Sequence, residues 1–470
     1  MDELWRWPAT ALAGAIRTRR ISSREATEAC LARTREVNPT LNAIVEVLDA
    51  EALAAADAAD LAVGRGEALG PLHGVPVTTK VNVDQRGLAT TNGIVAFRDA
   101  IATDDSPVVS NLRRAGAVIF GRTNTPAFSF RWFTENDLHG RTLNPWSRER
   151  TPGGSSGGAS SAVAAGMGPI AHGNDLAGSV RYPAYCTGVY GLRPSFGRVP
   201  AFLPSAKEER PPGMQTMSVQ GPLARTVGDL RIALEAMAAR DPRDPWWVPA
   251  PLRGPALARP MRVAMTVSVP GAVVHPAIVR AVEQAGAWLA ESGYAVEAVD
   301  PPHLEEAASL WSAIADTEVR TLMADTVARF GDAGLRTAMA GMQRGSTELG
   351  LEGYMRAMAR RTALVRDWFA FLERYPLVLG PVCAEPPFPW GLDTTTPENM
   401  DRVRFAQGPQ FMVPVLGLPS LSAPLGAVDG VPIGVQLTGP RYREDLVLDA
   451  AEVLEARHPS ATPITPGWSP

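Results

Sequence analysis

Short apolar runs alternate with amphipathic stretches along most of this chain, and that pattern predicts strands alternating with helices. The sequence Ser22-Ser23-Arg24-Glu25 has the form of a capping box, and the helix that it opens is expected to end near Val37, before Asn38-Pro39. An alanine-rich helix is predicted over residues 49–63. Neither helix carries chemically distinctive residues, so both are expected to cover the core.

The order strand, helix, strand recurs further along the chain. It is predicted twice, over residues 74–80, 106–115 and 117–121 and again over residues 261–267, 276–291 and 294–299. Spacings of this kind indicate βαβ units and a largely parallel sheet, which places the chain in the α/β class. Further strands are predicted over residues 376–380 and 431–437, and a closing helix over residues 445–456.

Residues 151–183 interrupt this regular pattern with two Gly/Ser clusters, Gly153–Gly158 and Gly178–Ser179. A small-residue segment that could form a tightly packed helix separates the two clusters. Glycines allow positive φ and close approach of backbone amides to a ligand, and serines among such amides could act as nucleophiles beside an oxyanion hole. A flexible linker is the alternative. Apolar residues follow the clusters directly, which favours a packed segment.

The composition is that of a globular protein with an ample core, because 45% of the 470 residues are hydrophobic and 20% are charged. A net charge of −4 provides no electrostatic footprint for nucleic acid or an anionic membrane surface. Cys30, Cys186 and Cys383 show no metal-site spacing and suggest a reducing compartment, so a cytoplasmic location is expected. The N-terminus does not have the form of a signal peptide, and prolines break the longest apolar stretch, so no membrane association is predicted.

Lysine is rare in this chain. Only Lys80 and Lys207 are lysines among 45 basic residues, and Lys80 stands in the apolar sequence VPVTTKVNV. Arginine cannot lose its proton in a protein, whereas a desolvated lysine can become a neutral base. A strand lysine that snorkels to the surface is the structural alternative for Lys80.

Three kinds of chemistry compete at the Gly/Ser clusters. A phosphate-binding loop would require a lysine within the stretch, and none is present. Residues 153–157 match the G-x-S-x-G nucleophile elbow, but the residues before them predict no strand to carry it. The third combination uses Lys80 as a base, Ser155 as a proton relay and Ser179 as a nucleophile.

At this point the chain resembles the amidase signature family. The resemblance rests on GPLHGVPVTTKVNVD, RRAGAVIFGRTNTP, the block from GGSSGGASS through NDLAGSVRYP to GLRPSFGRVP, QGPLARTVGDL and GVPIGVQLTGP. It implies that Ser179 is the acyl-accepting nucleophile, that Ser155 is a bridging serine preceding a cis peptide bond, and that Lys80 is the base. It further implies an oxyanion hole formed by the amides of Leu176, Ala177, Gly178 and Ser179, and an acyl-enzyme mechanism without metal or cofactor.

The resemblance also implies an architecture. We expect a mixed twisted sheet of about ten to eleven strands with helices on both faces, in a single domain over residues 1–470. The signature core is expected over about residues 70–240 and a variable helical region that forms the substrate pocket over about residues 300–410. Leu176 and Ala177 depart from the common S-D-T-G-G-S pattern, and the Cβ of Ala177 places the oxyanion geometry in question.

Two functions follow from this family. The first is a free-standing hydrolase of small-molecule amides, and by the same acyl-enzyme route of esters or carbamates, acting as a monomer or homodimer. The second is the glutaminase subunit of a tRNA-dependent amidotransferase. Aromatic residues suggest an apolar or aryl substrate, although several could simply pack in the core. The predicted pocket residues are Phe128, Trp132, Phe133, Phe202, Trp311 and Trp390.

Overall fold

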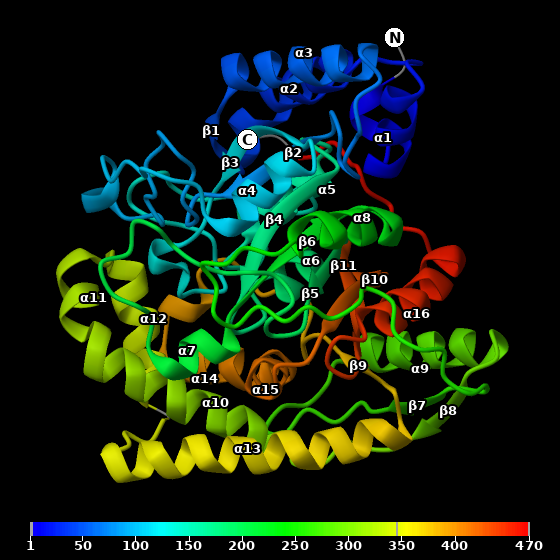
Figure 1. Ribbon diagram of the computed structural model, residues 1–470. Helices are drawn as coiled ribbons and strands as arrows, with labels where there is room; N and C mark the ends of the chain where they lie inside the picture. The colour runs from blue at the N-terminus through cyan, green and yellow to red at the C-terminus, as the bar shows by residue number, and fades with distance from the viewer. Residues whose placement is uncertain (1–2, 345, 469–470) are drawn as a thin grey trace.

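The computed structural model describes residues 3–344 and 346–468, and within them eleven strands form one mixed sheet (Figure 1). The strands are β1 (Ile44–Val47), β2 (Pro76–Lys80), β3 (Val118–Thr123), β4 (Ile170–Asp175), β5 (Tyr190–Arg193), β6 (Val219–Ala224), β7 (Arg262–Met265), β8 (Ala295–Ala298), β9 (Leu377–Pro381), β10 (Ser420–Val428) and β11 (Val431–Thr438). Their order across the sheet is β1-β3-β2-β4-β6-β5-β10-β11-β9-β7-β8. One sheet thus draws strands from nearly the whole chain, and we infer from this that the chain forms a single domain.

The helices lie around this sheet, so the predicted α/β fold with a mixed sheet and flanking helices is confirmed. They are α1 (Ala9–Arg17), α2 (Ser23–Leu41), α3 (Asp49–Gly64), α4 (Pro107–Arg114), α5 (Gly157–Ala164), α6 (Arg181–Thr187), α7 (Pro212–Met217), α8 (Val227–Met237), α9 (Pro276–Glu291), α10 (Leu304–Glu318), α11 (Ala324–Phe330), α12 (Ala333–Arg344), α13 (Leu351–Arg374), α14 (Pro397–Ala406), α15 (Gly408–Leu416) and α16 (Glu444–Arg457). A π-helical turn, Val319–Met323, joins α10 to α11. Helices α1 to α3 gather at one end of the molecule, and α10 to α15 at the other (Figure 1).

The predicted capping box is present at the start of α2, where the side chains of Ser22 and Glu25 each accept a hydrogen bond from the other's backbone amide. The predicted end of this helix at Asn38-Pro39 is wrong. Pro39 lies inside the last turn, and the helix ends one residue before Asn42, which adopts the left-handed conformation and donates its backbone N–H to the carbonyl of Asn38. A proline near the end of a helix removes few hydrogen bonds, which explains why the helix continues through it.

Strands β4, β6 and β10 were not predicted, because glycine, proline and polar residues obscure their pattern. Pro222 lies inside β6, opposite His172 of β4 and beyond the two residues at which β6 pairs with β5. Pro424 lies in β10 where the register with β11 shifts. Proline cannot donate to a strand ladder, and both positions are ones where a donor is not required.

The position of the functional site follows from the pairing of β2 with β4. These two strands are parallel neighbours in the interior of the sheet, and every residue of both is buried. Parallel strands bring their carboxyl ends to the same edge of a sheet, which is where α/β proteins place ligands. Lys80 ends β2, while Asn174 and Asp175 end β4, so this edge collects the polar residues described next.

Candidate active site

The side-chain nitrogen of Lys80 contacts three polar side chains. Nζ lies 2.7 Å from Oγ of Ser155, 2.8 Å from Oδ1 of Asn174 and 3.2 Å from Oγ of Ser156, and the lysine is fully buried. A carbonyl oxygen such as Oδ1 of Asn174 can only accept a hydrogen bond, so Asn174 takes one N–H of the lysine. A neutral Lys80 that donates to Asn174 and Ser156 has its lone pair left to accept the proton of Ser155.

Burial lowers the pKa of Lys80 well below its ordinary value, because the charged form loses its hydration in the core. The carboxylate of Asp175 opposes this shift, and the guanidinium of Arg210 reinforces it. The lysine that the composition singles out is therefore placed where its neutral form is favoured. This is the protonation state that a base requires.

Ser155 reaches Lys80 from the first Gly/Ser cluster, directly before α5. The Gly154–Ser155 peptide bond is cis, so the serine follows this bond, and the expectation that it would precede it is wrong. The fully buried Gly154 touches the backbone of the loop that contains Arg131 and Trp132, where a Cβ would collide. In the described chain no strand leads into this cluster, so the match to a nucleophile elbow has no structural counterpart.

Ser179 lies on a tight turn between β4 and α6, and 8% of its surface is exposed. Gly178 adopts a φ of +85°, and a Cβ at this position would overlap the side chain of Gln410. The backbone N–H of Ser156 donates to the carbonyl of Ser179 at 3.2 Å. The two Gly/Ser clusters, which are far apart in the sequence, are thus adjacent at this edge of the sheet.

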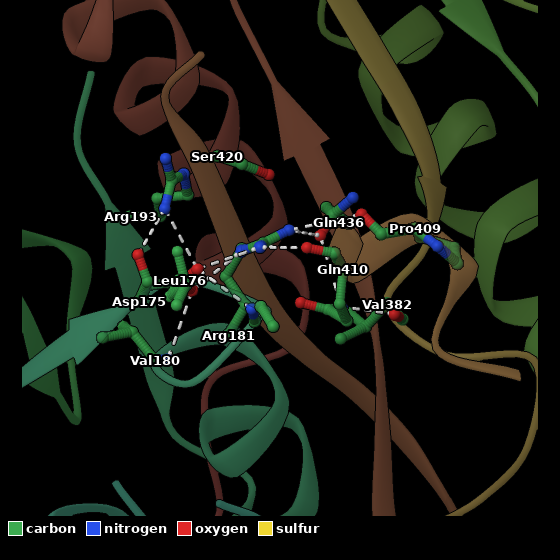
Figure 2. A network of polar contacts seen from close by, with 12 residues as sticks. Asp175, Leu176, Val180, Arg181, Arg193, Val382, Pro409, Gln410, Ser420 and Gln436 are labelled. Carbon is green, nitrogen blue, oxygen red and sulfur yellow. Dashed lines mark hydrogen bonds and ion pairs between the residues drawn. The ribbon is translucent and has the colours of Figure 1, made fainter. Parts of the chain in front are cut away.

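A buried ionic network supports the turn (Figure 2). The carboxylate of Asp175 accepts hydrogen bonds from the amides of Gly178 and Val180, at 3.0 and 3.2 Å, and from the guanidinium of Arg181, at 3.0 and 3.1 Å. Arg193 donates to the same carboxylate at 3.1 Å and to the Asp175 carbonyl at 2.6 Å. Burial would raise the pKa of Asp175, but Arg181 and Arg193 hold it well below its ordinary value. Asp175 thus forms a buried ion pair with Arg181, and Arg193 adds a second guanidinium to it.

The four amides predicted as an oxyanion hole differ in their availability. The amide of Gly178 donates to Asp175, whereas within the described residues the amides of Leu176, Ala177 and Ser179 have no hydrogen-bond partner. The carbonyl of Leu176 accepts a hydrogen bond from Nε1 of Trp311. The φ of Ala177 is not positive, so its Cβ causes no backbone strain. The amides of Leu176, Ala177 and Ser179 are therefore the free donors of this loop.

A cavity of about 560 Å³ opens onto Ser179. Its walls are mainly apolar, with Ser129, Arg131 and Asp316 as the polar exceptions. The lining residues are Ser129, Phe130, Arg131, Trp132, Leu176, Ala177, Ser179, Met214, Trp311, Ala315, Asp316, Val319, Met339 and Met342. Two of the six predicted aromatic pocket residues, Trp132 and Trp311, are among them.

The other four predicted aromatic residues lie elsewhere. Phe133 is fully buried, 6.3 Å from the ring of Phe388 and 6.1 Å from that of Trp390, so it belongs to the core. Phe128 packs in a neighbouring hydrophobic cluster, and neither Phe202 nor Trp390 lines the cavity. Phe128 has a φ of 54°, in the left-handed region, and the chain turns there so that the next aromatic residue enters the cavity. Aromatic residues so close in sequence cannot be assigned to pocket or core without this turn.

The sequence did not point to the methionines of the cavity. Met214, Met339 and Met342 contribute flexible, polarisable walls that adapt to irregular ligands. Met339 and Met342 are three residues apart on α12 and share a helical face, a spacing that could have indicated them. They come from the region over about residues 300–410 that was predicted to shape the substrate pocket.

Two other kinds of site, one with a histidine base and one with a bound metal ion, do not match the residues described here. His172 accepts a hydrogen bond from the backbone of Lys80 at Nδ1 and bonds Gln220 through Nε2, and burial lowers its pKa to about 4. These two hydrogen bonds use both ring nitrogens, so neither is available to a substrate. Within the described residues no cluster of His, Cys, Asp and Glu could hold a metal ion.

Across the same part of the chain, no helix is long and apolar enough to cross a membrane.

The mixed sheet, with a lysine and two serines gathered at the edge of its central strands, defines an α/β enzyme of the amidase signature type. Comparison with known proteins agrees with this. Residues 25–448 match the amidase family. The chain is 48% identical over 457 residues to an indoleacetamide hydrolase of Bradyrhizobium diazoefficiens, covering 97% of this chain and 87% of that protein. A crystal structure of a bacterial aryl acylamidase superposes with a TM-score of 0.83 at 27% identity, covering 97% of each chain.

The chain belongs to the amidase family and is an amidase that acts on carbon–nitrogen bonds other than peptide bonds. A glutamyl-tRNA(Gln) amidotransferase subunit of Acidothermus cellulolyticus is 33% identical, covering 98% of this chain and 96% of that protein. This identity is well below the 48% shared with the indoleacetamide hydrolase. The free-standing amide hydrolase is therefore better supported than the amidotransferase subunit.

Proposed function

We propose that this amidase cleaves neutral amides of aryl-substituted acids through an acyl-enzyme on Ser179. The observation that carries the proposal is the 2.7 Å contact between Nζ of the buried Lys80 and Oγ of Ser155, directly beside the loop of Ser179. Three groups then have distinct roles. Lys80 is the base, Ser155 the relay and Ser179 the nucleophile.

In the first half of the reaction, Oγ of Ser179 forms a bond to the carbonyl carbon of the amide. Its proton passes to Ser155, and the proton of Ser155 passes to neutral Lys80. The tetrahedral intermediate collapses when the carbon–nitrogen bond breaks, and the proton returns from Lys80 through Ser155 to the departing amine. A water molecule then attacks the ester on Ser179 by the same proton route and releases the carboxylic acid.

The developing negative charge on the carbonyl oxygen requires donors that are already in place. We propose the amides of Leu176, Ala177 and Ser179 for this role, because they are the free donors of the loop. The amide of Gly178 contributes indirectly, since its bond to Asp175 holds the turn. The predicted four-amide hole thereby becomes a three-amide proposal.

The substrate class follows from the cavity and from the relatives. Apolar walls and three methionines favour an uncharged aryl or arylalkyl group on the acyl side. Indoleacetamide, for which one relative is named, is an amide of this chemistry. Esters and carbamates remain part of the proposal, because the same acyl-enzyme route applies to them.

The experiment compares wild type with Ser179→Ala on a panel of arylacetamides, aliphatic amides, glutamine, aryl esters and carbamates. Mass spectrometry of the quenched wild-type reaction is expected to find the acyl group on the peptide that contains Ser179, and the variant is expected to be inactive. Preference for glutamine would favour the amidotransferase alternative. Full activity of Ser179→Ala would contradict the site.

Cellular location and assembly are also proposals. The cysteines Cys30, Cys186 and Cys383 are all free and buried, which supports a cytoplasmic protein. A monomer or homodimer that acts without a second subunit is expected, and light scattering of the purified, active protein measures this.

A further inference from the structure

We propose that Trp311, assisted by Trp132, positions the oxyanion loop of this amidase, in addition to lining its cavity. The inference rests on the proposed function of Leu176–Ser179. Nε1 of Trp311 donates to the carbonyl of Leu176 and Nε1 of Trp132 donates to the carbonyl of Ala177, each at 2.9 Å. The two indoles thus hold consecutive carbonyls of the loop that precedes the nucleophile.

The geometry of a trans peptide connects each of these carbonyls to an amide. In a planar trans peptide, the C=O of one residue and the N–H of the next point in opposite directions. Holding the Leu176 carbonyl against Trp311 therefore directs the N–H of Ala177 the other way, and this N–H is one of the free donors. Holding the Ala177 carbonyl fixes the next peptide in the same manner.

The two indoles differ in what else restrains the peptide that they contact. The peptide held by Trp132 is also held at its N–H end, where Gly178 donates to Asp175 at 3.0 Å. The peptide held by Trp311 has no second anchor within the described residues, because the N–H of Ala177 has no partner. Loss of the Trp311 bond should therefore free the orientation of an oxyanion donor, whereas loss of the Trp132 bond should be buffered by Asp175.

The indoles are themselves held rigidly. Trp311 belongs to α10 and Trp132 to an irregular segment after β3, and they are 8% and 5% exposed. The ring of Phe411 from α15 lies between them, stacked on Trp311 with ring centroids 4.6 Å apart and edge-on to Trp132 at 5.5 Å. The three rings of Trp311, Trp132 and Phe411 come from three separate elements. Their mutual packing restricts the motion of each ring and so helps to position the loop.

This arrangement also affects specificity. Because both indole N–H groups are used by backbone carbonyls, neither is available to a substrate. The two largest aromatic side chains of the cavity consequently present only ring carbon to the ligand. This favours acyl groups without hydrogen-bond acceptors at that wall, since an acceptor placed there would lose its water without compensation.

The test removes one indole N–H at a time and keeps an aromatic ring, in Trp311→Phe and Trp132→Phe. Trp247→Phe is the matched control, because Nε1 of Trp247 also donates to a backbone carbonyl, that of Ala238, at 3.0 Å but outside the cavity. For Trp311→Phe, kcat for an arylacetamide is expected to fall roughly ten- to hundred-fold, with KM within about two-fold and an unchanged pH profile. In Trp132→Phe, kcat is expected to fall by a smaller factor. In Trp247→Phe, kcat is expected to equal that of wild type.

A second readout separates positioning from packing. The affinity for an arylmethyl trifluoromethyl ketone, which forms an oxyanion on a nucleophilic serine, should fall with kcat in Trp311→Phe, while affinity for the arylacetate product should not. If Trp311→Phe is unstable, incorporation of 3-benzothienylalanine at position 311 retains the ring shape without the N–H. Equal loss of ketone and product affinity, or wild-type kcat in the benzothienyl variant, would overturn the proposal. Trifluoromethyl ketone that fails to bond Ser179 in wild type would instead refute the proposed function.

Discussion

Replacing Lys80 with methionine tests the protonation state on which the mechanism depends. Lys80 has no exposed surface, and burial lowers its pKa well below the ordinary value, so the folded protein holds this proton more weakly than the unfolded chain does. Between its folded pKa and about 10.4, the value for an unfolded lysine, the resulting penalty decreases by about 1.4 kcal/mol for each pH unit. Over that range, wild type should therefore gain about 1.4 kcal/mol per pH unit relative to Lys80→Met.

The sign follows from proton binding. The unfolded chain binds one more proton at Lys80 than the folded chain in this range, so the stability of wild type rises with pH. The variant loses the hydrogen bonds to Ser155 and Asn174, but this loss is independent of pH and leaves the slope unchanged. Methionine keeps the length of the side chain and removes the titrating group.

The assay is urea unfolding of both proteins at several pH values, with the difference in the free energy of unfolding plotted against pH. Titration of all other groups cancels in this difference. Lys207→Met is the matched control, because Lys207 is exposed and its replacement removes the other lysine of the chain without touching the buried site. A flat line for Lys80→Met would mean that the folded protein keeps Lys80 charged, and would refute its role as a neutral base.

Three further changes test the rest of the site. Asp175→Asn leaves two buried guanidinium groups without their carboxylate and should lower the free energy of unfolding by about 3–5 kcal/mol, measured in urea; a loss below about 1 kcal/mol would contradict the network. Ser155→Ala should lower kcat roughly 10²- to 10⁴-fold with little change in KM, and an unaltered kcat would exclude a relay. Met339→Trp fills part of the cavity and should lower kcat/KM for arylacetamides more than for acetamide, in parallel kinetics; an equal effect on both would place the acyl group elsewhere.

The chemistry was more predictable from the sequence than the pocket was. Lys80 stands out because lysine is rare, and it lies at the end of a β-branched strand whose period and composition are readable. Its serine partners come from glycine-dense clusters, where close approach of the backbone demands those residues. Both signals are local, because each is carried by a few residues that are neighbours in the sequence and whose type is set by the local backbone or side-chain environment.

The pocket depends on how the folded chain places its residues, and a local sequence pattern does not show this placement. Phe128 and Phe133 flank Trp132 in the sequence, yet only the tryptophan lines the cavity, because the backbone turns through positive φ at Phe128 and Ser129. Strand β4, which carries Asn174 and Asp175, is buried between β2 and β6 and so contains glycine and histidine in place of an alternating pattern. In both examples, the role of the residues is set by how they are buried in the folded chain and not by their intrinsic propensity for a secondary structure.

Leu176 and Ala177 show why the departures from the family pattern cannot be judged one residue at a time. Both line the cavity, and both give their carbonyls to the indoles, while the amide of Ala177 remains free at the nucleophile. One short loop thus contributes to substrate shape and to oxyanion geometry. A change at either position that enlarges or narrows the cavity must also move a peptide that Trp311 or Trp132 holds, so specificity and turnover should vary together in this enzyme.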